Sequence, residues 1–284
     1  VDEGSRIDVS GKGKVAAPNA STYSGGSYGG KGGDAGYGGN LIPETFGNYQ
    51  QPIDFGLGGA NGSSRGGGAL KLIADTLQLD GKILANGGTL TSHGGGGAGG
   101  SLWLDIGAIN SVSGNGEISA NGASRHSVGG GGGGGRIAIY YNTKTGITDS
   151  KITTLGGNGS PQNGGAGTIY FKNKTGAVTH PFIITGNGSG SNYATTGIND
   201  LSAETHIQIN NAAVSLSGID PAVKLDLTNS QVTLADADTL SGELNAQNSV
   251  LNLVGNALIN NAALGLVNTA LNIAGNAEFN RTIS

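Results

Sequence analysis

The sequence predicts an all-β protein built as a parallel β-helix, that is, a β-solenoid. Three observations predict this fold class. Gly supplies 57 of the 284 residues, about three times its usual share of roughly 7%. Apolar residues alternate with polar ones in short runs, which is the period-two pattern of a strand. These runs recur at nearly constant spacing, as they do when supersecondary units stack along an axis.

The first set of repeats consists of strands that each follow a Gly-rich run. They cover 69–72, 101–104, 136–139 and 168–171, so their starting points are nearly evenly spaced along the chain. A second alternating element follows a turn in each unit, at 79–86 and 112–121, with a further copy expected at 9–17 and weaker copies at 152–158 and 182–187. One unit of strand, turn, strand and Gly-rich run is what one coil of a solenoid requires.

The second set of repeats is shorter, and its copies begin with Asn211, Asn229, Asn248 and Asn268, again at nearly even spacing. Each Asn leads into an alternating apolar run. Asn tolerates the left-handed backbone conformation of a tight corner, and stacked amides hydrogen-bond along a column. We therefore interpret these four residues as a structural Asn ladder.

A change in composition divides the chain. Residues 1–190 hold 51 of the 57 Gly and are predicted to form Gly-rich coils with a period of about 32–35, interrupted by a long excursion at 19–68. The predicted junction is 191–205, and 206–284 are predicted to form regular coils with a period of about 18–20. The chain begins at Val1 rather than Met and stops inside a repeat, so we expect a segment of a longer chain.

The Gly runs, of which 129–135 is the longest, leave two interpretations open. They are either solvated flexible loops or extended helices of the polyproline II type packed backbone to backbone, which only Gly permits at such close approach. If the runs pair between copies of the chain, replacing Gly131 to Gly134 should abolish assembly while leaving the rod folded.

The excursion is rich in aromatic residues set among Gly and Ser. Two interpretations stay open here as well: these side chains pack over the rod, or they contact a ligand or partner. A small anion-binding patch is a further hypothesis, because two His precede Gly runs at equivalent places. The candidate contact residues are Tyr23, Tyr28, Tyr37, Phe46, Tyr49 and Phe55 in the excursion, and His93, Arg125 and His126 in the patch.

The sequence predicts no catalytic residues. The absence of Cys excludes a thiol nucleophile and Cys-ligated zinc, and the acidic residues are scattered rather than paired across a groove as glycoside hydrolysis requires. The fragment 29–34 matches part of the calcium-binding nonapeptide, but Gly36 occupies its apolar position and no tandem copy follows. Asp34 is therefore a weak calcium candidate, and we expect no other cofactor or metal.

The repeats at 211–275 resemble the coils of filamentous-haemagglutinin-like and autotransporter-passenger adhesins. The Gly tract with its strand at 129–141 is similar to modules of very large Gly-rich bacterial surface proteins. The resemblance implies a right-handed β-helix, used for adhesion or matrix building outside the cell or on a bacterial cell surface. Phage tail-fibre adhesins with stacked Gly helices are a second resemblance, which does not account for the repeats after residue 205.

These observations predict a non-enzymatic structural or adhesive segment. A rigid rod would present loops 19–68, 87–100 and 122–135 to a surface, a glycan, identical subunits or neighbouring segments of its own chain. A phage-type receptor-binding adhesin and a polysaccharide lyase or glycoside hydrolase on the same scaffold remain the alternatives. The formal charge of −4 and the lack of an apolar run of about 18 residues favour neither nucleic-acid binding nor membrane insertion.

Overall fold

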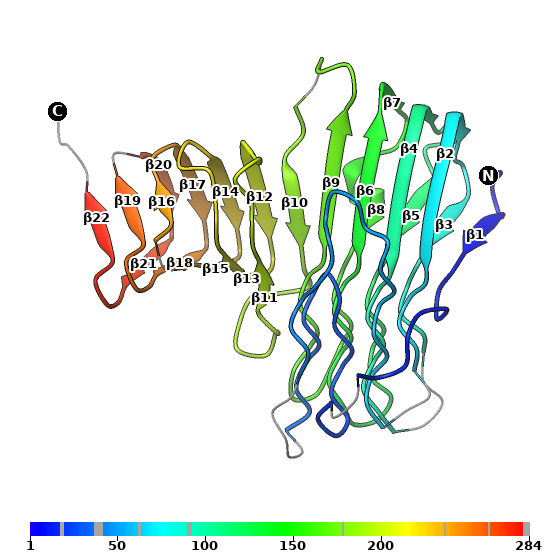
Figure 1. Ribbon diagram of the computed structural model, residues 1–284, viewed down its shortest axis with the longest axis horizontal. Helices are drawn as coiled ribbons and strands as arrows, with labels where there is room; N and C mark the ends of the chain where they lie inside the picture. The colour runs from blue at the N-terminus through cyan, green and yellow to red at the C-terminus, as the bar shows by residue number, and fades with distance from the viewer. Residues whose placement is uncertain are drawn as a thin grey trace.

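The computed structural model describes residues 1–17, 20–36, 42–61, 64–89, 93–177, 179–235, 237–260 and 262–280. Within them the protein is essentially all-β with parallel sheets, which confirms the predicted fold class at that level (Figure 1). A single turn of 3₁₀ helix, η1, spans Asp149–Lys151.

The described strands form four sheets. The long sheet has ten strands: β2 (Ala69–Gln78), β4 (Ser101–Asn110), β6 (Arg136–Tyr141), β9 (Thr168–Asn173), β10 (Phe182–Thr185), β12 (His206–Asn210), β14 (Lys224–Thr228), β17 (Glu243–Gln247) and β20 (Ala263–Val267), with β7 (Thr143–Thr145) beside β4. A second sheet contains β1 (Arg6–Asp8), β3 (Lys82–Leu84), β5 (Glu117–Ser119) and β8 (Ile152–Thr153). A third contains β11 (Thr196–Ile198), β13 (Ala213–Leu216), β15 (Gln231–Leu234), β18 (Val250–Leu253) and β21 (Ala270–Ile273), and a fourth β16 (Thr239–Leu240), β19 (Leu258–Asn260) and β22 (Glu278–Asn280).

Strand register follows the spacing of both sets of repeats. In the first half Ala69 pairs with Ser101, Ser101 with Arg136, and Arg136 with Thr168, as the spacing predicted. In the second half each strand of the third sheet pairs in parallel with its copy in the next coil, as Val214 does with Val232. Stacking equivalent residues lets every inward apolar side chain lie on its copy in the next coil.

Two predicted copies of the second element are wrong. The first strand is β1, in which Ile7 pairs with Ile83, so the copy expected at 9–17 is misplaced. That match depended on Gly-x-Gly turn residues, which carry little register information, and Gly13 instead hydrogen-bonds to Gly66. The copy expected at 182–187 is also wrong, because β10 joins the long sheet and does not extend the sheet of β8.

The strand direction reverses between β9 and β10. These two strands are antiparallel, whereas every other pair in the long sheet is parallel, so the arrows of β2, β4, β6 and β9 oppose those of β10, β12, β14 and β17 in Figure 1. The predicted junction at 191–205 marks the change in composition. The change in direction comes earlier in the chain.

The hydrophobic core changes sides of the long sheet at the same point. In β9, Ile169 belongs to the core of the first half, while Tyr170 belongs to the core of the second. In β10, Ile183 faces the first core and Phe182 the second. The outer face of the sheet in one half therefore becomes its inner face in the other, as neighbouring residues of a strand point to opposite faces.

The Gly tract 129–135 is buried and packed, which favours the ordered interpretation over the solvated one. Its amides donate in pairs three residues apart: Gly130 and Gly133 to the carbonyls of Tyr23 and Gly26, Gly131 and Gly134 to those of Gln162 and Gly165, and Gly132 and Gly135 to those of Ala123 and Ala120. Its carbonyls accept from further Gly-rich segments, including Gly96 and Gly99. A three-residue period without internal hydrogen bonds is the pattern of the polyproline II helix, here surrounded by other chain segments that run side by side below the strands in Figure 1.

This packing overturns the expectation for Gly131 to Gly134. A Cβ at Gly131, Gly132, Gly133 or Gly134 would overlap a backbone carbonyl oxygen of a neighbouring segment. The tract lies inside one chain and is not a face that pairs between copies. Its substitution is therefore expected to disturb folding itself.

The excursion crosses the face of the long sheet that the first core leaves free. Gly26 and Gly33 take part in the Gly packing, and the stretch around Tyr49 lies against both halves. Thr45 donates to the carbonyl of Gly197, and Tyr140 donates to that of Gln50 at 2.9 Å. The described part of the excursion is thus a strap over the place where the two halves meet.

Asp80 holds the turn that follows β4. Its carboxylate accepts from the Gln78 side chain and from the amide of Ser113 and the hydroxyl of Ser111, at 2.8–2.9 Å. These hydrogen bonds, the one from Gln78 first, hold the pKa of Asp80 well below its ordinary value of 3.8.

We therefore expect Asp80→Asn to destabilise the protein at neutral pH more than Asp75→Asn, an exposed control on β2. Because the pKa of Asp80 is lower in the folded protein than in the unfolded chain, its ionised carboxylate stabilises the fold. This stabilisation is complete at pH values above the pKa of the unfolded chain, and it is lost as the pH falls through the pKa of the folded protein. The difference between wild type and Asp80→Asn should therefore shrink below about pH 4. Urea titrations at several pH values measure it, and a difference independent of pH would contradict the assignment.

Candidate functional site

The outward face of the long sheet in the second half carries the most regular set of polar side chains. The inward positions of β12, β14 and β17 are occupied by Ile and Leu, with one Ala in β17. Because successive side chains of a strand point to opposite faces, the alternate positions point to solvent. Parallel register aligns them into three ranks across the strands: His206, Lys224 and Glu243; Gln208, Asp226 and Asn245; and Asn210, Thr228 and Gln247.

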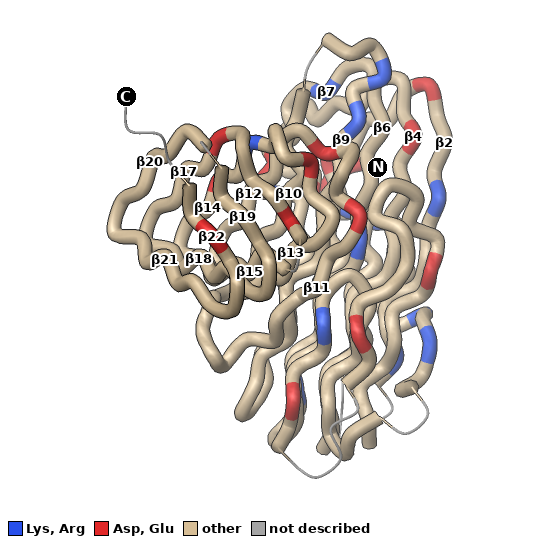
Figure 2. The backbone as a smooth tube through the Cα atoms, turned by 60° about the vertical axis from the view of Figure 1, so that its left-hand side comes forward, with Lys and Arg blue, Asp and Glu red and all other residues tan. Residues whose placement is uncertain are grey.

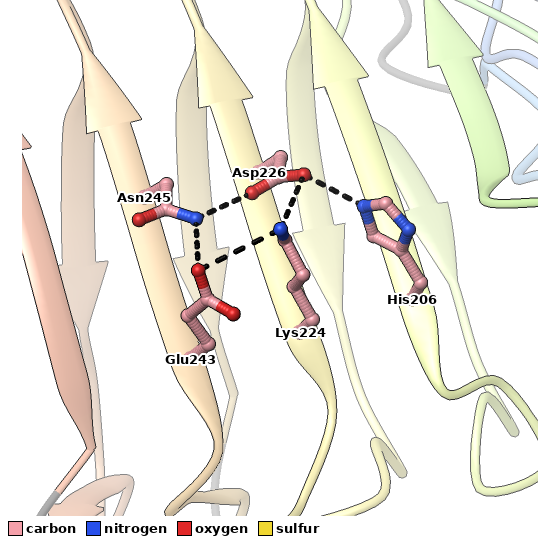
Figure 3. Close-up of polar contacts among 5 residues, drawn as sticks. All are labelled: His206, Lys224, Asp226, Glu243 and Asn245. Atoms are coloured by element: carbon pink, nitrogen blue, oxygen red, sulfur yellow. Dashed lines mark hydrogen bonds and ion pairs between the residues drawn. The ribbon is translucent and has the colours of Figure 1, made fainter.

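Five of these side chains form a paired charged strip (Figure 3). Asp226 Oδ2 lies 2.7 Å from His206 Nε2 and 3.7 Å from Lys224 Nζ. Lys224 Nζ also lies 3.6 Å from Glu243 Oε1, and Asn245 Nδ2 donates to Asp226 at 2.9 Å and to Glu243 at 2.7 Å. Both carboxylates are thus engaged with cations and an amide, so the strip is a cross-strand network that orders this face, each exposed pair contributing about 0–1 kcal/mol.

The flanking rank is chemically different, because its polar groups are unpaired. It comprises Thr185 of β10, Asn210, Thr228 and Gln247, and we call it the amide rank. Among the described residues none of these side chains makes a hydrogen bond, and the Gln208 amide beside them makes none either. Their donors and acceptors are available to a ligand or to water.

A pocket lies at the corner where this outward face meets the first core. Its volume is about 240 Å³. Apolar side chains of the first half, Ile152, Ile169 and Ile183, line one side, and Gln208 and Asn210 line the other. The pocket exists because the core changes sides here: the face that is buried up to β10 becomes exposed from β12 onward.

Two of the excursion aromatics, Tyr28 and Tyr49, occupy interior positions. Tyr28 is fully buried, hydrogen-bonds to Ser101 at 2.6 Å and contacts the Phe46 ring at 5.1 Å, and burial raises the pKa of Tyr28 to about 12. Tyr49 is buried against the Tyr170 and Phe182 rings. These positions correspond to the packing interpretation of the two that the sequence left open.

The remaining excursion residues lie differently. Tyr23 is half-buried with a positive φ of 63°, and its carbonyl accepts from Gly130. Phe55 is 43% exposed. Tyr37 lies outside the described residues.

Two buried charged groups belong to this packing and were missed in the sequence. Glu204 is 8% exposed and accepts from the Tyr49 hydroxyl at 3.0 Å, and burial raises the pKa of its carboxyl. Arg136 is 4% exposed, donates to the Phe46 carbonyl at 3.0 Å, and lies over the Tyr28 ring. No local pattern marks them, because the partners of each lie far away in the sequence.

The hypothetical anion-binding patch is only partly assembled. A backbone bridge joins Gly94 to His126, which brings the segments of His93 and His126 together as the repeat spacing predicted. Both His side chains are exposed, and Arg125 donates to the carbonyl of Ser127 at 3.1 Å instead of extending to either. The patch stays a prediction.

Asp34 is engaged in a local turn, in which its Oδ1 accepts from the Gly36 amide at 2.9 Å. Within the described part of the chain, no group of three His, Asp or Glu side chains is arranged to hold a metal ion. The calcium candidate at Asp34 stays a prediction.

The four ladder Asn residues lie at exposed corners with φ of 47–50°, the left-handed conformation that the repeat predicted. Asn229 donates to Asn211 at 3.2 Å, and Asn268 donates to Asn248 at 3.3 Å. The residue after each Asn turns inward, as Ser230 does when it bonds to the carbonyls of Ile209 and Thr228. These corners are structural.

The amide rank was also missed in the sequence, although a signal for it exists. Once the second repeats are aligned, Asn210, Thr228 and Gln247 occupy one outward position in successive coils, two positions after the rank of Gln208. The pocket has no such signal, because it depends on the meeting of two halves.

No protein-family model, curated protein or solved structure matches the chain. None of the described segments forms a helix long and apolar enough to cross a membrane. Figure 2 shows acidic and basic residues scattered over both halves rather than gathered into a patch of one sign.

Proposed function

We propose that this chain is a non-enzymatic structural and adhesive segment of an extracellular or bacterial cell-surface protein. The observation that carries the proposal is the continuous long sheet, which passes through both halves and couples two cores and a packed Gly bundle into one stiff body. Such a scaffold holds a surface at a fixed orientation. The resemblance to filamentous-haemagglutinin-like and autotransporter-passenger coils supports the same role.

We infer further that both halves wind as right-handed solenoids. Parallel strands of one sheet are joined by right-handed crossovers in about 98% of cases. Reversing strand direction alone would invert the winding sense, and so would moving the core to the other face of the sheet. Both changes occur together between β9 and β10, so the hand is retained.

The last described coil supports attachment to another copy or to a neighbouring segment. Leu266 and Ile273 are 41% and 50% exposed, whereas their register partners Ala246 and Leu253 are buried. A further coil stacked on β20, β21 and β22 would cover the exposed positions and pair the free strand edges.

The test combines electron microscopy with polymer binding. Purified chain is imaged by negative stain at increasing concentrations, and is sedimented with soluble polysaccharides whose viscosity is followed. We expect fibres or co-sedimentation, with unchanged viscosity. Falling viscosity would show a polysaccharide-degrading enzyme. The absence of both fibres and co-sedimentation would refute the adhesive role.

A further inference from the structure

We propose that the amide rank and the corner pocket form one binding groove for a neutral oligosaccharide. This inference rests on the proposed adhesive role and names the surface and ligand class that it uses. The groove crosses β10, β12, β14, β17 and β20 on the outward face of the long sheet.

Two hollows lie along this line. The corner pocket is lined by Thr185, Gln208 and Asn210, and the second hollow by Thr228, Gln247 and Gly265 among others. They follow one another over adjacent strands in register. With roughly 4.8 Å between neighbouring strands, five strands give a track of about 19 Å from β10 to β20, long enough for an extended chain of several sugar units.

Gly265 keeps the far end open. It continues the rank of Gln208, Asp226 and Asn245, and a Cβ there would crowd the Asn245 side-chain oxygen. Because Gly265 has no side chain, the outward face of β20 does not rise as high as that of β17, where Asn245 projects. The second hollow lies over this part of β20.

The chemistry of the groove selects a neutral ligand with many hydroxyls. Amides and hydroxyls of the rank both donate and accept hydrogen bonds, as sugar hydroxyls do. The neighbouring strip contributes two basic side chains, His206 and Lys224, against two acidic ones, Asp226 and Glu243, all mutually paired. The Asp149 carboxylate at the pocket rim is held by Lys144 at 2.8 Å. Among the described residues of the pocket and the strip, no unpaired charge favours an anionic polymer.

The apolar side of the pocket suits the C–H face of a sugar ring, which carries no hydroxyls. Ile152, Ile169 and Ile183 are core residues that are 3%, 2% and 7% exposed, so their edges form a narrow apolar floor for the C–H face of a pyranose ring, while the amides face its hydroxyls. Ligand sites are commonly apolar concavities with a few placed polar groups, and sites for drug-sized molecules measure about 300–1,000 Å³. At about 240 Å³ the pocket suits one ring, with the rest of the chain along the rank.

The test screens the full chain against an array of neutral and anionic oligosaccharides and then measures the best neutral one by isothermal titration calorimetry. Gln208→Ala and Asn210→Ala should each weaken binding about tenfold, since each removes an amide that makes one to two hydrogen bonds. Gln231→Ala, an exposed amide on β15, is the matched control and should leave the dissociation constant unchanged.

Both test residues are half-buried and make no hydrogen bonds through their side chains among the described residues, so both variants should fold. Circular dichroism and the unfolding midpoint check this. Binding of anionic oligosaccharides alone, or of no neutral one, would overturn the proposal. Equal binding by Gln208→Ala and wild type would overturn it too, while leaving the adhesive role intact if the chain still co-sediments with polymers.

Discussion

Replacing Gly133 by alanine should destabilise the Gly-rich half by about 3 kcal/mol or more, because overpacking alone costs about 1–3 kcal/mol and the displaced backbone also loses hydrogen bonds. The amide of Gly133 donates to Gly26 at 2.9 Å, and its carbonyl accepts from Gly99 at 2.9 Å. A methyl group would overlap the carbonyl oxygen of Gly30. The three atoms nearest to the added methyl group all belong to the backbone of Gly30 and Lys31, so no flexible side chain can move aside to make room for it.

Gly190→Ala is the matched control, because a Cβ there meets nothing within 4 Å and its φ lies outside the left-handed region. Denaturant titration followed by circular dichroism compares the two variants. Hydrogen exchange adds an independent measurement: the amides of 130–135 should exchange as slowly as those of the strands. Equal unfolding midpoints for the two variants, or fast exchange throughout the tract, would contradict the packed bundle.

Phe182→Ala should lower the free energy of unfolding by about 3–5 kcal/mol, the usual cost of removing a buried aromatic ring. Phe182 is 1% exposed and packs 4.7 Å from the Tyr49 ring, centroid to centroid. It is the first side chain of β10 to point into the second core, so its loss leaves a cavity where the halves and the excursion meet.

Phe55→Ala makes the same chemical change at a side chain that is 43% exposed, and should change stability by less than about 1 kcal/mol. Urea unfolding monitored separately by tyrosine fluorescence and circular dichroism measures both variants. If Phe182→Ala cost no more than Phe55→Ala, the strap would not be packed against β10 as the structure has it.

The candidate site was less predictable than the strands. Tyr28 and Tyr49 stood out in the sequence because aromatic residues among Gly and Ser are typical of binding loops, yet both are interior. Gln208 and Asn210 did not stand out, because single amides on an outward strand face are common. Exposure and unpaired hydrogen-bonding groups distinguish these two sets, and both depend on contacts between distant segments.

The Gly tracts show a related limit. Their recurrence at one place in each coil indicated order, but Gly has no side chain and so carries no pattern that identifies its neighbours. Gly131 hydrogen-bonds to Gln162, which follows it in the chain, and Gly130 to Tyr23, which lies far back in the excursion. Only backbone packing in three dimensions selects these partners.

The sequence by itself determined the all-β class, the spacing of the two sets of repeats, the register of the strands at 69–72, 101–104, 136–139 and 168–171, and the left-handed Asn corners, because each follows from a local period or from the preference of a single residue. It did not determine the register of the first strand or the sheet that β10 joins. The tertiary structure alone decided the reversal between β9 and β10, the transfer of the core to the other face, the strap and the corner pocket. Residues such as Ile169 and Tyr170 are apolar on both faces of the sheet, so alternation cannot say which face is buried. Which face is buried depends on which segments of the chain pack against it.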